Sequence, residues 1–308
     1  MKAAVIKDYE APVEISEVDA PALADDSVLV DVHAASLNPI DNILRAGHLK
    51  EMIPLQFPHV MAYDVSGVVR AVGKDVTGFK VGDRVFARPN QEDAGALAEV
   101  ARVKAAELAL NPANLTHAET ASIPLAGLTA WQALVDKAGV QPGQKVLIHA
   151  GSGGVGTLAI QIAKHLGAYV ATTVSPRNAE LVRSLGADEV IDYHSQDFAQ
   201  LLSDYDMVFD MLGGETLEKS FKILKKGGHL VSIKGQDEKD QAKDYGVKFD
   251  WFFMEPNGTQ LTTLAGLLED GTLKPVIDSE FAMADVAAAY DKLADGHAVG
   301  KIVVNVAA

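Results

Sequence analysis

Apolar residues in the second half of the chain fall into short runs that alternate with longer segments of helix-forming residues. The short runs lie at residues 145–149, 169–174, 189–191, 207–209 and 229–233. The segments between them have a helical composition at 157–166, 178–185 and 216–224, and glycines just after the helical segments are typical of helix C-termini. This alternation predicts an α/β fold with a doubly wound parallel sheet.

The first 120 or so residues have a different pattern of apolar and turn-forming residues. Short apolar or alternating stretches at 28–32, 65–72, 84–87 and 96–103 are broken by Gly, Pro, Asn and Asp, which predicts a β-rich region. A helical composition follows at 118–134, interrupted by Pro124 and Gly127. The N-terminal part is therefore expected to form a domain of its own.

The remaining segments are less regular. Residues 235–247 form a polar, charge-dense insert that is either a helix face or a mobile loop, and the pattern leaves both open. We expect a last strand of the parallel sheet at 247–253, a helix at 260–269 and a final strand at 301–306. An apolar, aromatic strand at a sheet edge invites pairing with a second copy, so the segment 247–253 predicts a homodimer.

Composition and charge restrict the class of protein. A chain of 308 residues can hold two domains, and 48% hydrophobic with 22% charged residues is typical of a globular protein. The sequence has no run of 18 apolar residues that could span a bilayer, and its first residues do not resemble a signal peptide. We therefore expect a cytoplasmic protein. The net charge of −15 argues against nucleic acid or an anionic membrane as a partner.

Cysteine is absent, and the nine histidines are scattered. Thiol catalysis, disulfides and cysteine-ligated metal sites are thereby excluded. The sequence leaves open a metal site assembled from distant His and carboxylate residues, but no spacing motif points to one.

A glycine-rich turn between the run at 145–149 and the helical segment carries the most specific signal. The residues of this turn are Gly151, Ser152, Gly153, Gly154, Val155 and Gly156. Between a strand and a helix, such spacing is typical of a dinucleotide site, because small residues let the backbone approach a pyrophosphate at the helix N-terminus. The alternative is a tight turn that binds nothing.

The residues after the second strand bear on the choice of cofactor. An NAD site usually places an acidic residue about 20 residues beyond the turn, but no acidic residue lies between 157 and 179. Ser175 and Arg177 stand there instead and could bind a 2′-phosphate, with Lys164 and Tyr193 as further neighbours. This pattern favours NADP (NADPH). Alternatively, Ser175 and Pro176 are the N-cap and first residue of a helix.

Several motifs that lie far apart in the chain together match the sequence pattern of a protein family. They are ASLNPID at 35–41, DVSGVV at 64–69, VGDRV at 81–85, GLTAW at 127–131, GADEVIDY at 186–193 and GKIV at 300–303, together with the glycine turn. Along nearly its whole length the chain resembles the zinc-independent quinone oxidoreductase branch of the medium-chain dehydrogenase/reductase family. The resemblance implies a GroES-like catalytic domain at 1–121, completed by 258–308, and a Rossmann NADP-binding domain at 122–257, with cofactor and substrate meeting between them.

The resemblance also bears on metal. Zinc-using members of the family supply metal ligands at three places, where this sequence has Asn38, Tyr63 and Leu125. Leucine is no ligand, and Asn and Tyr are poor ones, so a metal-free enzyme is expected. Ala62, where the family usually has Gly, is a small departure that affects no expected role.

Without zinc, hydrogen-bond donors must stabilise negative charge on a substrate oxygen as hydride arrives. The expected catalytic donors are the Asn38 amide and the Tyr63 hydroxyl. The resemblance further implies that Asn38, Thr129 and Lys301 lie at the cofactor. The alternatives are that Asn38 and Pro39 only begin a helix, and that Tyr63 only lines the pocket. Asp41 is interpreted as structural.

These expectations combine into one function. We expect an NADPH-dependent, metal-free oxidoreductase that transfers hydride to a quinone or an α,β-unsaturated carbonyl, because such acceptors need no strong Lewis acid. The alternatives are an enoyl or alkenal double-bond reductase, and an NADPH-binding sensor protein without significant turnover.

Overall fold

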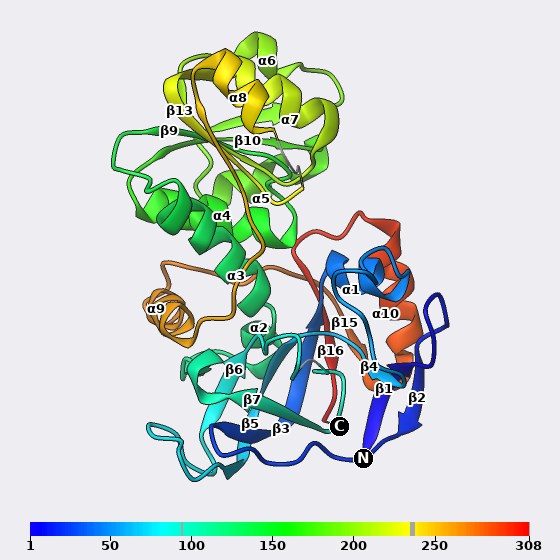
Figure 1. Cartoon of the computed structure of the whole chain (residues 1–308). Helices are drawn as coiled ribbons and strands as arrows, with labels where there is room; N and C mark the ends of the chain where they lie inside the picture. Colours follow the sequence, from blue (N-terminus) through cyan, green and yellow to red (C-terminus); the bar gives the residue numbers. More distant parts are fainter. Residues whose placement is uncertain (94, 235–237, 308) are drawn as a thin grey trace. The chain divides into compact units, whose positions relative to one another are not determined.

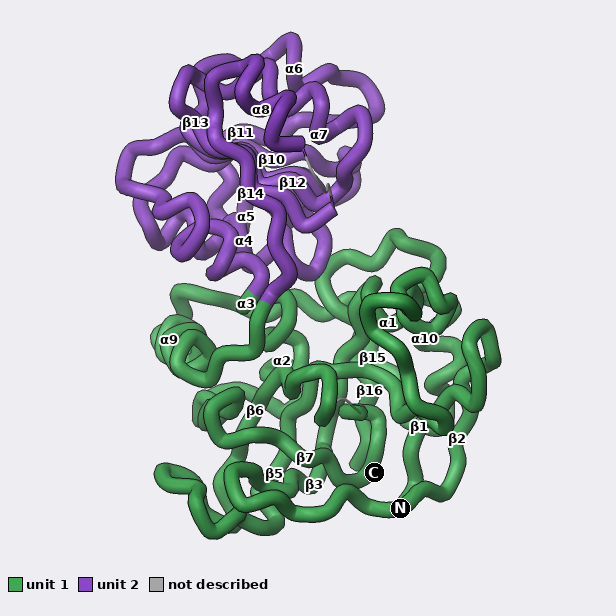
Figure 2. Tube along the Cα trace, viewed as in Figure 1, with its two compact units in different colours: residues 1–128, 255–308 green, residues 129–254 purple. Residues whose placement is uncertain are grey.

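The computed structural model describes residues 1–93, 95–234 and 238–307. The chain forms two compact units, each with its own core. Unit 1 comprises Met1–Leu128 and Glu255–Ala308, and unit 2 comprises Thr129–Met254 (Figure 2). The C-terminal segment thus folds with the N-terminal one.

Unit 2 is built on a six-stranded sheet whose strands are all parallel (Figure 1). In spatial order the strands are β11 (Glu189–Asp192), β10 (Tyr169–Val174), β9 (Lys145–Ile148), β12 (Tyr205–Asp210), β13 (Leu224–Ser232) and β14 (Lys248–Trp251). Counted from the first strand of the unit, this is the order 3-2-1-4-5-6 of the dinucleotide-binding fold. The predicted doubly wound sheet is confirmed, and the expected last strand lies at its edge.

Helices connect these strands and cover a core centred on Leu147, Val208 and Leu230. They are α4 (Gly154–His165), α5 (Ala179–Ser184), α6 (Phe198–Leu201), α7 (Gly214–Ser220) and α8 (Lys239–Tyr245). Helix α4 begins three residues before the predicted start at 157, because Gly153 takes the N-cap. In the polar insert, residues 239–245 are helical, and 235–237 lie outside the described residues.

The predicted helix over 118–134 is divided. It consists of α2 (His117–Ala121), α3 (Pro124–Trp131) and the π-helix η2 (Gln132–Lys137). Pro124 is the first residue of α3, where the missing N–H of proline has no helical partner to lose. Short 3₁₀ segments occur at η1 (Ala105–Glu107), η3 (Pro176–Asn178), η4 (Phe221–Ile223) and η5 (Met283–Asp285).

Unit 1 contains two sheets. The larger has the order β15 (Ile277–Ala282), β16 (Lys301–Asn305), β3 (Ser27–Leu37), β5 (Asp64–Val72), β6 (Arg84–Ala87) and β8 (Leu108–Leu110), and β7 (Val100–Lys104) also pairs with β3. The smaller has the order β2 (Glu14–Glu17), β1 (Lys2–Ile6) and β4 (His59–Val60). The remaining helices are α1 (Pro39–Arg45), α9 (Gly258–Glu269) and α10 (Val286–Asp295).

The register of the larger sheet positions the polar residues discussed below. Strand β16 pairs antiparallel with β3, with Ile302 opposite Leu37, and β3 pairs with β5, with Ser36 opposite Asp64. The end of β3 and the starts of β5 and β16 are therefore neighbours. Among the described helices, none has the length and apolar character needed to cross a membrane.

Candidate active site

The glycine turn of unit 2 joins β9 to α4 through close packing. A Cβ on Gly151 would lie 2.0 Å from Thr172 Oγ1, and one on Gly156 would lie 2.3 Å from the carbonyl oxygen of Ala150. No side chain fits at such distances. These two glycines are therefore needed for the contact of the turn with β10 and with its own backbone.

Gly153 differs from its neighbours. It is the N-cap of α4, and a Cβ there would meet only the Ala150 oxygen, at 3.4 Å, which is ordinary contact. Because glycine has no side chain to cap the helix, the first N–H groups, those of Gly154, Val155 and Gly156, have no intrahelical acceptor. Such an end attracts an anion. The turn therefore leaves room beside the first N–H groups of α4, where an anion could bind.

The predicted 2′-phosphate residues lie at the C-terminal ends of β10 and β11. Ser175 is the N-cap of η3 with Pro176 after it, as the alternative interpretation predicted, but its side chain makes no capping hydrogen bond. The exposed Arg177 forms no salt bridge or side-chain hydrogen bond within the part of the chain that the structure describes. Tyr193 donates its backbone N–H to Val174 over 3.4 Å and is 55% exposed. Ser175, Arg177 and Tyr193 are therefore available to a ligand.

A side-chain contact ties this region to the glycine turn. Asn178 Nδ2 donates to Ser152 Oγ over 2.9 Å. The glycine turn and η3 thus share one hydrogen bond, and its donor, Asn178, is the last residue of the stretch 175–178 on which the cofactor choice is expected to depend.

Lys164 has to be removed from the predicted phosphate neighbours. It lies in the last turn of α4, about 15 Å along the helix from the glycine turn. Its Nζ binds the Asp188 carboxylate at 2.7 Å and the Ala168 carbonyl at 3.0 Å. The expectation was wrong because ten residues of helix separate Lys164 from the end that would face the cofactor.

In unit 1, Asn38 stands at the N-cap of α1, as one of its two interpretations predicted. Its backbone N–H donates to Asp41 Oδ2 over 2.7 Å. The side-chain amide has further partners: Nδ2 donates to Asp64 Oδ2 over 2.9 Å, and Oδ1 accepts a short hydrogen bond from Lys301 Nζ. Asn38 therefore begins a helix and also belongs to a buried polar cluster.

Asp64 is the centre of this cluster and has no exposed surface. Its Oδ2 accepts from Ser36 Oγ at 3.1 Å, from Asn38 Nδ2 and from Lys301 Nζ, and its Oδ1 accepts from the Leu125 backbone N–H at 2.8 Å. A buried carboxylate needs such partners, since an unpaired charge in the interior is costly.

Lys301 has no hydrogen left for another acceptor. Its Nζ donates to the Leu37 carbonyl at 2.9 Å, to Asn38 Oδ1 and to Asp64 Oδ2 at 3.1 Å. A lysine ammonium has three N–H groups, and these three bonds use all of them. The described contacts of Lys301 Nζ are therefore to Leu37, Asn38 and Asp64, and its expected contact with the cofactor stays a prediction.

Tyr63 is buried, and its hydroxyl already has an acceptor. The O–H donates to Gln91 Oε1 over 2.7 Å, and the Arg88 guanidinium carbon lies 4.6 Å from the ring centroid. Burial, together with the nearby Asp41 charge, raises the pKa of Tyr63 to about 12. The hydroxyl is therefore neutral, and its single hydrogen is directed at Gln91.

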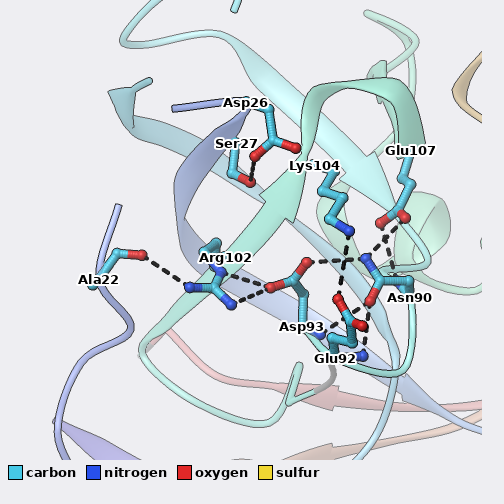
Figure 3. A network of polar contacts seen from close by, with 9 residues as sticks. All are labelled: Ala22, Asp26, Ser27, Asn90, Glu92, Asp93, Arg102, Lys104 and Glu107. Carbon is cyan, nitrogen blue, oxygen red and sulfur yellow. Dashed lines mark hydrogen bonds and ion pairs between the residues drawn. The ribbon is translucent and has the colours of Figure 1, made fainter. Parts of the chain in front are cut away.

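A polar network fixes the loop that carries Gln91 (Figure 3). Asn90 Nδ2 donates to Asp93 Oδ2 and to Glu107 Oε1, each over 2.9 Å. Arg102 binds the Asp93 carboxylate and also donates to the Ala22 carbonyl. Because Asn90 precedes Gln91 directly, this network holds the acceptor of the Tyr63 hydroxyl in place.

Asp41 combines full burial with an unpartnered oxygen. Its Oδ2 accepts from Asn38, whereas its Oδ1 has no hydrogen-bond partner in residues 1–93, 95–234 and 238–307. Burial is the main cause that raises the pKa of Asp41 to about 7, and the Asp64 charge acts in the same direction. Through its bond to the Asn38 N–H, Asp41 caps the start of α1, which is the structural role expected from the sequence.

The three positions that match zinc ligands in the family converge on Asp64. Asn38 and Leu125 both donate to its carboxylate, and Tyr63 precedes it in the chain. An amide, a phenol and an aliphatic side chain are not a zinc donor set. In the described residues, no group of three or more His, Cys, Asp or Glu side chains is arranged to hold a metal ion. The residues present do not fit zinc.

The sequence analysis also missed residues that surround the predicted donors. Asp64 could have been found, because a charged residue at the start of an apolar strand needs buried partners. Gln91 carries no such signal, since it lies in a polar loop. Thr129, expected at the cofactor, is buried in α3.

Comparison with known proteins gives matches along the chain. The family model described as alcohol dehydrogenase GroES-like domain matches residues 24–121, and the model described as zinc-binding dehydrogenase matches residues 185–304. A 2-methylene-furan-3-one reductase from Solanum lycopersicum is 40% identical, with 94% of this chain and 74% of the relative covered. An NADPH-dependent alkenal/one oxidoreductase from Arabidopsis thaliana, named as chloroplastic, is 39% identical, with coverages of 99% and 79%.

The fold is shared with solved structures as well. The quinone oxidoreductase from Coxiella burnetii superposes with a TM-score of 0.91 at 34% identity, covering 100% of this chain and 99% of the other. These relatives, which are reductases and oxidoreductases by name, match nearly the whole chain and therefore both of its units.

Proposed function

The chain belongs to the zinc-independent quinone oxidoreductase branch of the medium-chain dehydrogenase/reductase family, and on this premise we propose that it is an NADPH-dependent enzyme that reduces a quinone or an α,β-unsaturated carbonyl compound. Similarity to an alkenal/one oxidoreductase and to a quinone oxidoreductase supports both acceptor classes. The proposed catalytic part is residues 1–121 with 258–308, and the proposed NADP-binding part is 122–257.

The proposed cofactor site is the glycine turn with the residues after β10. The amide-rich start of α4 would hold the pyrophosphate, and Ser175 and Arg177, with Tyr193 beside them, would hold the 2′-phosphate. The open space at Gly153 supports this part of the proposal, as does the exposed Arg177, which has no side-chain partner within the described residues. When bound, NADPH supplies the hydride.

The protein's own contribution is to stabilise the charge that develops on the acceptor oxygen. The observation that carries this assignment is the Asn38 amide, whose oxygen faces Lys301 and whose nitrogen faces Asp64. Asp64 uses one of the two Nδ2 hydrogens, the other has no partner among the described residues, and we assign this second hydrogen to a substrate oxygen. A donor fixed in a buried setting is effective, because it needs no reorganisation during the reaction.

No metal is part of the proposal. Quinones and enones accept hydride without a strong Lewis acid, and the residues around Asp64 do not form a zinc donor set. We therefore expect activity to survive dialysis against a chelator.

One acceptor screen tests the function. NADPH absorbance is followed with a quinone series and with a matched series of 2-alkenals and enones, and saturation kinetics are recorded for each. Turnover of enones alone identifies a double-bond reductase, and turnover of quinones identifies a quinone reductase. NADPH binding without saturable turnover of either series would contradict the proposal and would favour the alternative, an NADPH-binding sensor protein.

We also propose a homodimer and a cytoplasmic location. Strand β14 ends the order of the sheet in unit 2, and Phe253 just beyond it is 45% exposed with its ring edge against Trp251. Such an apolar edge supports pairing with a second copy. A chain without cysteine needs no oxidising compartment to fold. Cell fractionation tests the location.

A further inference from the structure

We propose that the buried pair Lys301 and Asp64 serves as a positioning device for Asn38, and that it fixes which way the Asn38 amide points. This inference rests on the proposed function, because it concerns the donor assigned to the substrate oxygen. Neither Lys301 nor Asp64 touches the reacting atoms in this scheme, so both are positioning residues.

The direction of the amide follows from the chemistry of its partners. A lysine ammonium can only donate hydrogen bonds, and a carboxylate can only accept them. Lys301 Nζ lies against Asn38 Oδ1, and Asp64 Oδ2 lies 2.9 Å from Asn38 Nδ2. A flipped amide would set N–H groups against the ammonium and an oxygen against the carboxylate. Both contacts would then be repulsive, so only one orientation is allowed.

The same arrangement makes Asn38 a stronger donor. When the amide oxygen accepts from a cation, the amide is polarised and its N–H groups become better donors. Asp64 occupies one Nδ2 hydrogen, and the planar geometry of the amide fixes the direction of the other. The result is one oriented donor whose strength depends on the ammonium charge of Lys301, which is bound directly to the oxygen of the same amide.

The pair is assembled from strands that are far apart in the sequence. Lys301 begins β16, Asp64 begins β5, and Asn38 follows β3, and the register of the larger sheet brings these three ends together.

Stability alone is a weak reason for such a pair. The side chains of Lys301 and Asp64 are 6% and 0% exposed, and their closest contact is 3.1 Å. The free energy needed to remove two charges from water offsets much of their mutual attraction, so buried pairs often contribute little net stability. A role in orienting Asn38 accounts for the pair where a stabilising role does not.

The test is the double variant Asp64→Asn with Lys301→Met, which removes both charges together and leaves no unpaired one. We expect kcat to fall at least 10-fold on the acceptor found in the screen, with the Kd for NADPH within 2-fold of wild type. The matched control is Asp206→Asn with Lys225→Met, the same substitutions at an ion pair at the starts of β12 and β13. The control should keep kcat within 2-fold.

A double-mutant cycle that combines these substitutions with Asn38→Ala shows whether Lys301 and Asp64 act by positioning Asn38 or only support the structure. If the pair acts through Asn38, adding the double variant to Asn38→Ala should reduce kcat by less than 2-fold further. Independent, multiplicative losses would overturn the inference. Unchanged kcat in the double variant, with an active wild type, would overturn it while the proposed function stands.

A second measurement on the wild-type protein needs no turnover, and it uses Asn38→Ala only to assign the signals. The side-chain NH₂ signals of Asn38, assigned in a ¹H–¹⁵N spectrum by their loss in Asn38→Ala, should show one proton that exchanges with water at least 10-fold more slowly than a free amide. Two protons with free-amide exchange would overturn the inference. Slow exchange in a protein that reduces no acceptor would instead contradict only the proposed function.

Discussion

The hydroxyl of Tyr63 donates to Gln91 Oε1 over 2.7 Å, so the one hydrogen that Tyr63 could offer a substrate is already used. Asn38 keeps a second Nδ2 hydrogen after its bond to Asp64. The two donors expected from the sequence are therefore not equivalent, and Asn38 is the better candidate.

We expect Asn38→Ala to lower kcat by about 10- to 100-fold, because one oriented donor to a developing oxyanion is lost. Tyr63→Phe should change kcat by less than about 3-fold. Steady-state kinetics with the best acceptor, together with NADPH binding by fluorescence, measure both effects. A large loss in Tyr63→Phe with an unaffected Asn38→Ala would reverse the assignment.

The cofactor preference should depend on Arg177. Loss of a charged hydrogen bond to the 2′-phosphate costs about 1.5–3 kcal/mol, so Arg177→Ala should weaken NADPH binding by about 10- to 150-fold and leave NADH binding nearly unchanged. Arg183→Ala, at an exposed arginine in the last turn of α5, is the control. Equal losses for both cofactors would show that Arg177 only supports the fold.

The glycines of the turn should respond differently to alanine. Gly153→Ala meets only one ordinary contact, so we expect a Tm close to wild type but weaker NADPH binding, because the methyl group would occupy the space of the pyrophosphate. Gly156→Ala would place a Cβ 2.3 Å from the Ala150 oxygen and should destabilise the protein by about 1–3 kcal/mol. Thermal unfolding and NADPH titration distinguish the two. Full NADPH affinity in Gly153→Ala would argue against the pyrophosphate site.

The pKa of Asp41 predicts a pH dependence of stability. Burial raises this pKa from 3.8 to about 7, so the folded protein keeps a proton that the unfolded chain releases. The favourable contribution is complete below about pH 4 and is lost as the pH rises to about 7. Asp41→Asn keeps an acceptor for the Asn38 N–H but cannot titrate.

Urea unfolding at pH 5 and pH 7.5 measures this effect. Between these values the free energy of unfolding should fall by about 2 kcal/mol more in wild type than in Asp41→Asn. Identical pH dependence in the two proteins would show that Asp41 is ionised in the folded state.

The proposed dimer should depend on the edge of β14. Phe253→Glu places a charge on the exposed apolar edge and should convert the dimer to a monomer in light scattering at micromolar concentration. Leu201→Glu, at a comparably exposed residue of α6, should leave the dimer intact. A monomeric wild type would contradict the proposal directly.

Much of unit 2 could be predicted because its signals are local. The apolar runs at 145–149 and 169–174 and the glycine turn between them are patterns within about thirty residues, and β9, α4 and β10 follow them closely. Even so, Lys164 was expected near the cofactor, since sequence proximity does not show which end of a helix a side chain faces.

The sequence by itself determined the parallel sheet, the glycine turn and the residues that follow β10, because periodicity, turn chemistry and helix caps depend on neighbours a few residues apart. Only the tertiary structure decided the surroundings of Asn38. Lys301 lies 263 positions from Asn38 and Asp64 lies 26 positions from it, and the register of β3 with β5 and β16 brings them into contact. Hydrogen-bond partners of this kind are set by strand pairing over long separations, which no local pattern encodes.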